Sequence, residues 1–294
     1  MSTQFLRRVT GPSGHAGGQD AGDRMTRIHD RSDTREIALD RVGIAGLRYP
    51  LRVPVRAGSD ARADGVVGLW VGLDADERAA HMSRFVSTLE ANREQPLGPE
   101  AVRRLLEALR ENLGSRSAST EIRHPYYIVK RAPTTGAESR LACDVTVEAS
   151  LNEGGFDHVL SVRVPVLSVC PCSMETTGGD SHSQRGHVTV SVRTQGRVWI
   201  EDLVELVETS ASAPLYPLLS SDDERTVIEA AHDRPVLVED LARNVAERLD
   251  ADVRVLWYSV EARNLDSVHA HDAYASVTRT PRELKAGEAD GGET

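Results

Sequence analysis

The sequence predicts an α+β fold made of two similar modules, each in the order strand, strand, helix, helix, strand, strand. Three observations support this prediction. Runs rich in β-branched residues occur in pairs, runs with apolar residues three and four positions apart also occur in pairs, and the whole order repeats between residues 36 and 280. Antiparallel sheets covered on one face usually bury their remaining face and edges on another subunit, so we expect a homo-oligomer.

The first module is expected at residues 36–154. Its second helix carries clear end signals, because Gly98-Pro99 fits a helix start and Gly114 a helix stop. Its predicted segments, in the order given above, are 43–57, 65–75, 76–93, 98–114, 119–132 and 139–151.

The second module is expected at residues 155–280 and repeats this order. Residues 1–35 and 281–294 are rich in small and charged residues without a hydrophobic period, and we interpret both as disordered tails. The predicted segments of the second module are 156–169, 185–195, 200–211, 234–250, 252–264 and 273–280.

Composition excludes several classes of protein. A formal net charge of −10 argues against a general nucleic-acid binder, which needs a basic face. No apolar run is long enough to cross a membrane, and the N-terminal residues lack the apolar core of a signal peptide. Three unevenly spaced cysteines are too few for a disulfide framework. We therefore predict a cytoplasmic protein.

The stretch "SVCPCSMETTGGDSHSQRGHVTVSV", residues 168–192, places Cys170, Cys172, His182 and His187 between two predicted strands. Cys-Pro-Cys alone is more often a pair of buried apolar side chains than a reactive site. With two histidines nearby, a metal site and an ordinary loop become equal alternatives. A redox pair is disfavoured because the spacing is Cys-x-Cys.

A second histidine-containing turn, "LDSVHAHDAY", holds Asp266, His269 and His271 between the last two predicted strands. Alone this turn is more typical of a surface loop. Because both histidine-containing turns lie at equivalent positions between strands of the second module, they make a shared site plausible. Glu239 lies near a predicted helix start, where a carboxylate ordinarily complements the helix dipole, and Glu224 is interpreted first as solvated charge.

Several segments together resemble the type IB GTP cyclohydrolases, a prokaryotic family of the tunnelling-fold superfamily. In the second module they are "VPVLSVCPCSMETTGGDSHSQRGHVTV", "LYPLLSSDDE", "LVED" and "LDSVHAHDAYA". In the first module they are "LDRVGIAGLRYPL", "ERAAHMSRFVSTLE" and "YYIVKRAP". The resemblance is collinear over residues 36–277. It implies the tunnelling fold, a tetramer with active sites between subunits, and conversion of GTP and water to 7,8-dihydroneopterin triphosphate and formate, the first step of folate biosynthesis.

The resemblance also implies roles for individual residues. A divalent metal ion (zinc, manganese or ferrous iron) would activate the water that attacks C8 of the purine, and an imidazole would move protons. Glu239 would grip the guanine edge, with Arg185 and Lys130 as candidates for the triphosphate. The implied catalytic residues are Cys170, His182 and His269, and the implied metal ligands are Cys170, His182, Glu224, Asp266 and His269.

Two positions depart from the family pattern. Asp266 stands where the family usually has glutamate, and Ser220 and Ser221 replace a Lys-Arg pair. Two alternatives therefore remain open. One is a paralogue that binds a purine or pterin without turnover, and the other is a related tunnelling-fold enzyme that makes a cyclic-phosphate pterin. Nitrile reductases are disfavoured because their motifs do not match the Cys-Pro-Cys to His spacing.

Overall fold

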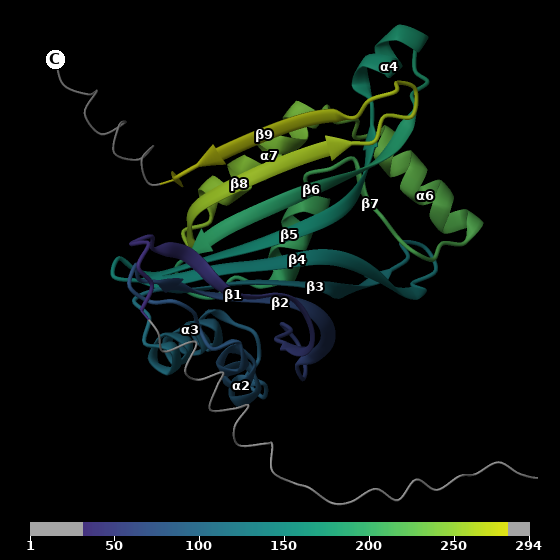
Figure 1. Cartoon of the computed structure of the whole chain (residues 1–294). Coiled ribbons are helices and arrows are strands. Elements are labelled where there is room, and N and C mark those ends of the chain that lie inside the picture. The colour runs from purple at the N-terminus through teal and green to yellow at the C-terminus, as the bar shows by residue number, and fades with distance from the viewer. Residues whose placement is uncertain (1–31, 282–294) are drawn as a thin grey trace, which may run out of the picture.

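The computed structural model describes residues 32–281, which form one nine-stranded antiparallel sheet with helices on one face (Figure 1). The predicted tails, apart from residues 32–35 and 281, lie outside the described residues. Along the sheet the strands follow the order β1-β2-β3-β4-β5-β6-β8-β9, and the short β7 pairs with β5. No helix among the described residues is long and apolar enough to cross a membrane.

The first half of the chain has the predicted order of elements. Helix α3 starts with Pro99 after Gly98 and stops at Gly114, whose φ of 69° places it in the left-handed region that glycine tolerates best. The prediction of both helix ends is therefore confirmed. The elements of this half are β1 (Leu39–Val53), β2 (Ala61–Leu73), α2 (Met82–Asn92), α3 (Pro99–Leu113), β3 (Ala118–Arg131) and β4 (Glu138–Asn152).

The second half repeats the order with three additions, the helices α4 and α6 and the strand β7. Its elements are β5 (Gly155–Val169), α4 (Pro171–Thr177), β6 (Ser183–Thr194), α5 (Ile200–Glu208), β7 (Ala213–Pro214), α6 (Ser221–His232), α7 (Val238–Ala251), β8 (Val255–Asn264) and β9 (Ala273–Arg279). A tight turn between Asn152 and Gly155 lets β4 pair with β5. The two halves therefore share one continuous sheet.

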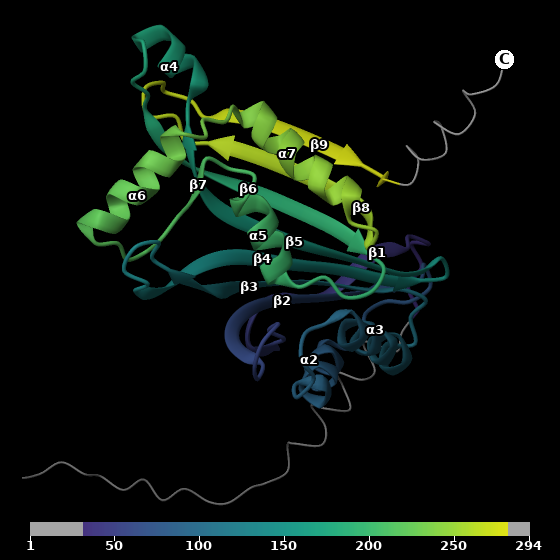
Figure 2. The ribbon, with the colours of Figure 1, turned by 180° about the vertical axis from the view of Figure 1, so that it is seen from behind.

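The helices cover one face of the sheet: α2 and α3 the first half, α5 and α7 the second (Figures 1 and 2). Strand β6 shows the resulting alternation. Val188, Val190 and Val192 are buried under the helices, whereas the alternate residues His187 and Thr189 face the opposite side. The buried core of residues 32–281 therefore lies between the sheet and the helices.

Two segments differ from the sequence-based expectation. Residues 171–177 form the helix α4 within a stretch expected to be loop, and residues 221–232 form α6 where only solvated charge was expected. The start of α6 carries a capping box, in which Ser220 and Asp223 hydrogen-bond each other's backbone N–H groups. The spacing Ser-x-x-Asp is the signal that could have predicted this helix.

Candidate functional site

Cys170 lies where β5 ends and α4 begins, and its side chain is partly buried. Its N–H donates to the C=O of His182 at 3.4 Å, and Ser181 Oγ donates to the C=O of Cys170 at 2.7 Å. His182 directly precedes β6, the strand that pairs with β5. Cys170 and His182 therefore stem from the same end of one strand pair, while Cys172 is exposed on α4.

The connection between β8 and β9 reaches the same end of the sheet (Figure 1). The N–H of Leu265 donates to the C=O of Arg185 at 2.9 Å, which continues the β6–β8 pairing past the end of β8. Ser267 Oγ lies 3.1 Å from Nδ1 of His182. The fold thus joins the two histidine-containing turns through the His182 ring, although 85 residues separate them.

Asp266 organises the β8–β9 turn. Its Oδ1 accepts the N–H groups of Val268 at 2.7 Å and His269 at 2.9 Å, and its Oδ2 lies 3.2 Å from Nδ1 of His269. These two N–H groups, that of His269 first, lower the pKa of Asp266 to about 2. The carboxylate is therefore ionised at neutral pH and orients the His269 ring, which stacks obliquely with His271 at 5.2 Å between centroids.

The start of α7, which carries Glu239, is anchored next to the Cys170 segment. The N–H of Val236 donates to the C=O of Val169 at 3.1 Å. Asn264 Nδ2 donates to Ser168 Oγ at 3.0 Å, and this hydroxyl donates to the C=O of Val236 at 3.2 Å. This buried chain of hydrogen bonds ties together the ends of β5 and β8 and the segment before α7, while Glu239 itself stays exposed.

Sequence reasoning missed Ser168 and Asn264. Both are almost fully buried, with 1% and 2% of their surface exposed. Polar residues that end otherwise apolar, buried strand faces are the signal that could have identified them, because a buried polar group needs a partner.

Glu224 is exposed in the first turn of α6, and its neighbour Asp223 fixes that turn. Asp223 Oδ1 accepts the N–H groups of Thr134 and Thr135, both at 2.8 Å. Its Oδ2 accepts the Thr135 hydroxyl and the N–H and hydroxyl of Ser220. Although burial raises the pKa of Asp223, the hydrogen bonds from Ser220 and Thr135 hold it well below its usual range. Asp223 therefore locks the β3–β4 turn to α6.

The two predicted triphosphate-binding cations have different surroundings. Lys130 Nζ lies 2.7 Å from both carboxylate oxygens of Glu208 and 4.8 Å from the ring centroid of Tyr216. Its charge is therefore balanced within the chain. Arg185 is exposed on β6, and its guanidinium forms no ion pair with the described residues.

His187, the other histidine of the Cys170 stretch, lies on the face of the sheet away from the helices. Its ring is 2.9 Å from an Arg163 guanidinium nitrogen. Burial and then the charge of Arg163 lower the pKa of His187, so it is neutral near pH 7.

Thiol, imidazole and carboxylate groups, the donor types suited to zinc, manganese or ferrous iron, lie on neighbouring turns at one end of the sheet. Among residues 32–281, however, no three His, Cys, Asp or Glu side chains lie close enough to hold a metal ion. The donor chemistry fits a metal. In the described residues Asp266 and His269 are in contact through their side chains, and Cys170 and His182 are joined through their backbones.

Comparison with known proteins gives results for both sequence and fold. A sequence model of the family described as type I GTP cyclohydrolase folE2 matches residues 25–275. The GTP cyclohydrolase FolE2 of Paraburkholderia xenovorans is 41% identical over 258 residues, covering 88% of this chain and 96% of that protein. The GTP cyclohydrolase FolE2 of Geotalea uraniireducens is 39% identical over 259 residues, covering 88% and 95%.

The fold comparison identifies a more distant group. The crystal structure of a hyper-thermostable AgUricase variant superposes with a TM-score of 0.51 at 13% identity, covering 82% of this chain and 92% of that one. At this identity the likeness concerns the fold alone. It confirms the predicted α+β class with helices on one face of an antiparallel sheet.

Proposed function

This chain belongs to the type I GTP cyclohydrolase FolE2 family, and on that premise we propose how its own residues carry out the reaction. The enzyme converts GTP and water to 7,8-dihydroneopterin triphosphate and formate in folate biosynthesis. The observation that supports the site assignment is the contact between Ser267 and His182, because it brings the Asp266–His269 turn to the end of the strand pair that carries Cys170.

Cys170 and His182 would hold a divalent metal ion, with Glu224 and His269 as further ligands and zinc, manganese and ferrous iron as candidate ions. When bound, the ion supplies a water acidic enough to attack C8 of the purine near neutral pH. With the Nδ1–H tautomer of His182, Ser267 Oγ would accept the Nδ1 proton and leave Nε2 free to coordinate.

Asp266, included above among the implied ligands, acts through His269. Its carboxylate is occupied by two backbone N–H groups and by Nδ1 of His269, an arrangement that orients an imidazole for coordination or proton transfer through Nε2. In the reaction, His269 exchanges a proton with a nitrogen of the opening imidazole ring of the purine.

Glu239 accepts two hydrogen bonds from the N1 and N2 edge of guanine. It lies in the first turn of α7, and the hydrogen bond from Val236 to Val169 ties that turn to the end of the sheet that carries Cys170 and His182. Arg185 has no anionic partner in the described residues and is proposed to bind the triphosphate. Lys130 stays a prediction for that role, and its ion pair with Glu208 makes it the weaker candidate.

A homo-oligomer with sites between subunits completes the proposal. Among residues 32–281 nothing covers the sheet face away from the helices (Figure 1), and the exposed apolar side chains Tyr127 and Val129 lie on its strand β3. In the same part of the chain, the edge strands β1 and β9 have no further strand beside them. These features, with the incomplete donor set, support a tetramer in which a second chain closes each site. The three free cysteines suit a cytoplasmic location.

The test is an assay of metal-stripped protein with GTP, in which zinc, manganese or ferrous iron is restored and both formate and the fluorescence of oxidised neopterin are followed. Cys170→Ser should lower kcat at least about 100-fold, and Glu239→Gln should raise KM. The matched controls are Cys172→Ser and Asp240→Asn, which change neighbouring residues outside the proposed site.

Other outcomes would overturn the proposal in distinct ways. Tight GTP binding without formate, whichever ion is added, indicates a non-catalytic purine-binding paralogue. Formate with a cyclic-phosphate product indicates the related tunnelling-fold reaction. Full activity of Cys170→Ser would refute the assignment of the metal site while leaving the family membership intact.

A further inference from the structure

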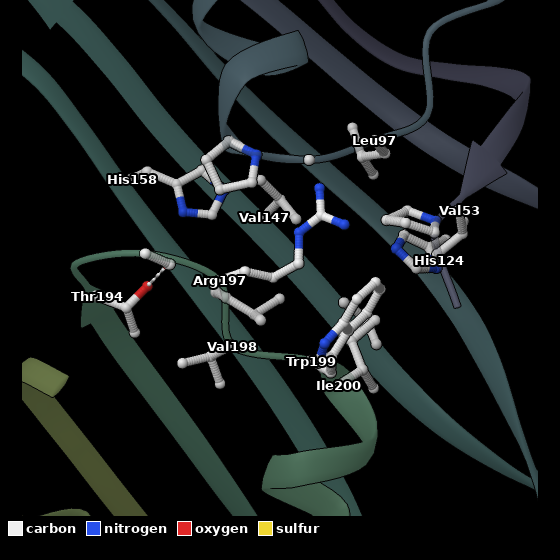
Figure 3. A pocket seen from close by; sticks show the side chains of 16 residues that line it. Val53, Leu97, His124, Val147, His158, Thr194, Arg197, Val198, Trp199 and Ile200 are labelled. Atoms are coloured by element: carbon white, nitrogen blue, oxygen red, sulfur yellow. Dashed lines mark hydrogen bonds between the residues drawn. The ribbon is translucent and has the colours of Figure 1, made fainter. Parts of the chain in front are cut away.

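A recess opens on the helix-covered face, between the helices of the two halves (Figure 3). It continues into a more open groove, and the two share Gly98, Pro99, His158, Thr194, Gly196 and Arg197. Both lie near the N-terminal end of β5 at His158, which is about 40 Å along that strand from Cys170. The recess is therefore separate from the GTP cyclohydrolase site.

The walls of the recess are mainly apolar, with two polar rings among them. The apolar side chains include Val53, Leu97, Val147 and Trp199. His124 is 5% exposed; its Nδ1 lies 3.0 Å from the C=O of Pro125, and its Nε2 has no partner among the described residues.

Burial lowers the pKa of both His124 and His158, so both rings are neutral at neutral pH. Nε2 of His124 is not fully buried and has no partner among the described residues, so this position in the wall is open to a ligand or water.

The mouth of the recess is cationic. In Figure 3 the guanidinium of Arg197 projects between His158 and His124. It lies 4.7 Å from the Trp199 ring centroid and forms no ion pair with the described residues. Arg103 and Arg104 line the adjoining groove, also without a carboxylate partner among the described residues.

Two further features add positive potential at the mouth. The N-terminus of the 15-residue helix α3 opens into the recess at Gly98, whose backbone position carries no side-chain cap. Two carboxylates, Glu100 and Asp157, line the groove. Asp157 accepts a hydrogen bond from Nε of Arg193 at 2.7 Å. Positive charge therefore exceeds negative charge there.

We propose that this recess binds a small anion with a flat apolar body, such as an aromatic carboxylate. The anionic head would meet Arg197 and the start of α3, and the body would lie against Val147 and Trp199, with the unpartnered nitrogen of His124 as a further polar contact. Four separate observations agree on this ligand: the apolar walls, the ring nitrogen of His124 without a partner among the described residues, the unpaired guanidinium and the uncapped helix start.

The experiment is isothermal titration of the full chain with 2-naphthoate and, for comparison, with the neutral 2-naphthamide. We expect the carboxylate to bind at least about tenfold more tightly than the amide, and Arg197→Gln to remove most of this difference. Arg62→Gln is the matched control, because Arg62 is likewise exposed and unpaired among the described residues but lies on β2, away from the recess.

A second variant separates loss of the charge at the mouth from a local misfold. Arg103 lies on the exposed side of α3, so Arg103→Gln should weaken 2-naphthoate binding by a smaller factor and leave circular dichroism and GTP turnover unchanged. The proposal is overturned if the amide binds as tightly as the carboxylate, if Arg197→Gln binds 2-naphthoate like the unaltered protein, or if neither compound binds at millimolar concentration.

Discussion

Replacement of Lys130 by methionine tests whether this residue serves the fold or the substrate. Lys130 Nζ lies 2.7 Å from both oxygens of Glu208, with the two side chains only 9% and 13% exposed. Burial raises the pKa of Glu208, and Lys130 opposes that rise. Removal of the ammonium leaves a buried carboxylate without its partner, which costs about 3–5 kcal/mol.

For a chain of this size, such a loss lowers Tm by about 6–20 °C. Thermal unfolding followed by circular dichroism, at equal protein concentrations, measures it. Arg131→Met is the matched control, since Arg131 pairs with Glu138 at 2.7 Å on the surface, with 73% and 58% of the two side chains exposed. Such a surface pair contributes less than about 1 kcal/mol.

The double variant Lys130→Met with Glu208→Leu separates the two roles. Because both buried charges are removed together, stability should return to within about 1 kcal/mol of the unaltered protein or exceed it. A raised KM for GTP in this stable double variant would show that Lys130 also contacts the triphosphate. If the single variant keeps its Tm and only raises KM, the reasoning about a structural ion pair is refuted.

Three further predictions rest on buried polar groups. The Asp223→Asn variant should melt at a lower temperature than Asp222→Asn, its exposed control. Because the pKa of Asp223 is lowered in the folded protein, the stabilisation lost in this variant is present above pH 4 and fades as pH falls. In a thiol-labelling assay of the folded protein at pH 8, Cys172 should react and Cys143 should not, since burial raises the pKa of Cys143 to about 12. Burial raises the pKa of Tyr258 to about 12 as well, so the free energy of unfolding should fall as pH rises from about 9 to 12; a constant value in denaturant titrations would contradict this.

The order of the strands and helices was predictable because it depends on local patterns. Alternating apolar residues such as Val188 and Val190, and the Gly98-Pro99 helix start, act over a few residues and are visible in the sequence. The two extra helices were not predicted, since α4 is only seven residues long and α6 has a polar first turn that resembles an exposed loop.

The contacts that hold the site together were beyond local patterns. The chain from Asn264 through Ser168 to Val236 joins residues up to 96 positions apart, and nothing in the local sequence pairs them. Lys130 gives the converse case. The family resemblance made Lys130 a candidate for the triphosphate, whereas its ion-pair partner Glu208 lies 78 residues away and is visible only in the fold.

The departure at Asp266 has a physical account in the geometry of its turn. An aspartate carboxylate reaches the N–H groups two and three residues ahead, and Asp266 accepts both at 2.7 and 2.9 Å. A glutamate carboxylate stands one methylene further from the backbone, so it could not accept both bonds in the same turn and would extend outward instead. The shorter aspartate side chain extends less far toward a bound ion, and its carboxylate instead orients the His269 ring through Nδ1. Under the proposed mechanism, Cys170, His182, Glu224 and His269 are therefore the donors that would hold the ion.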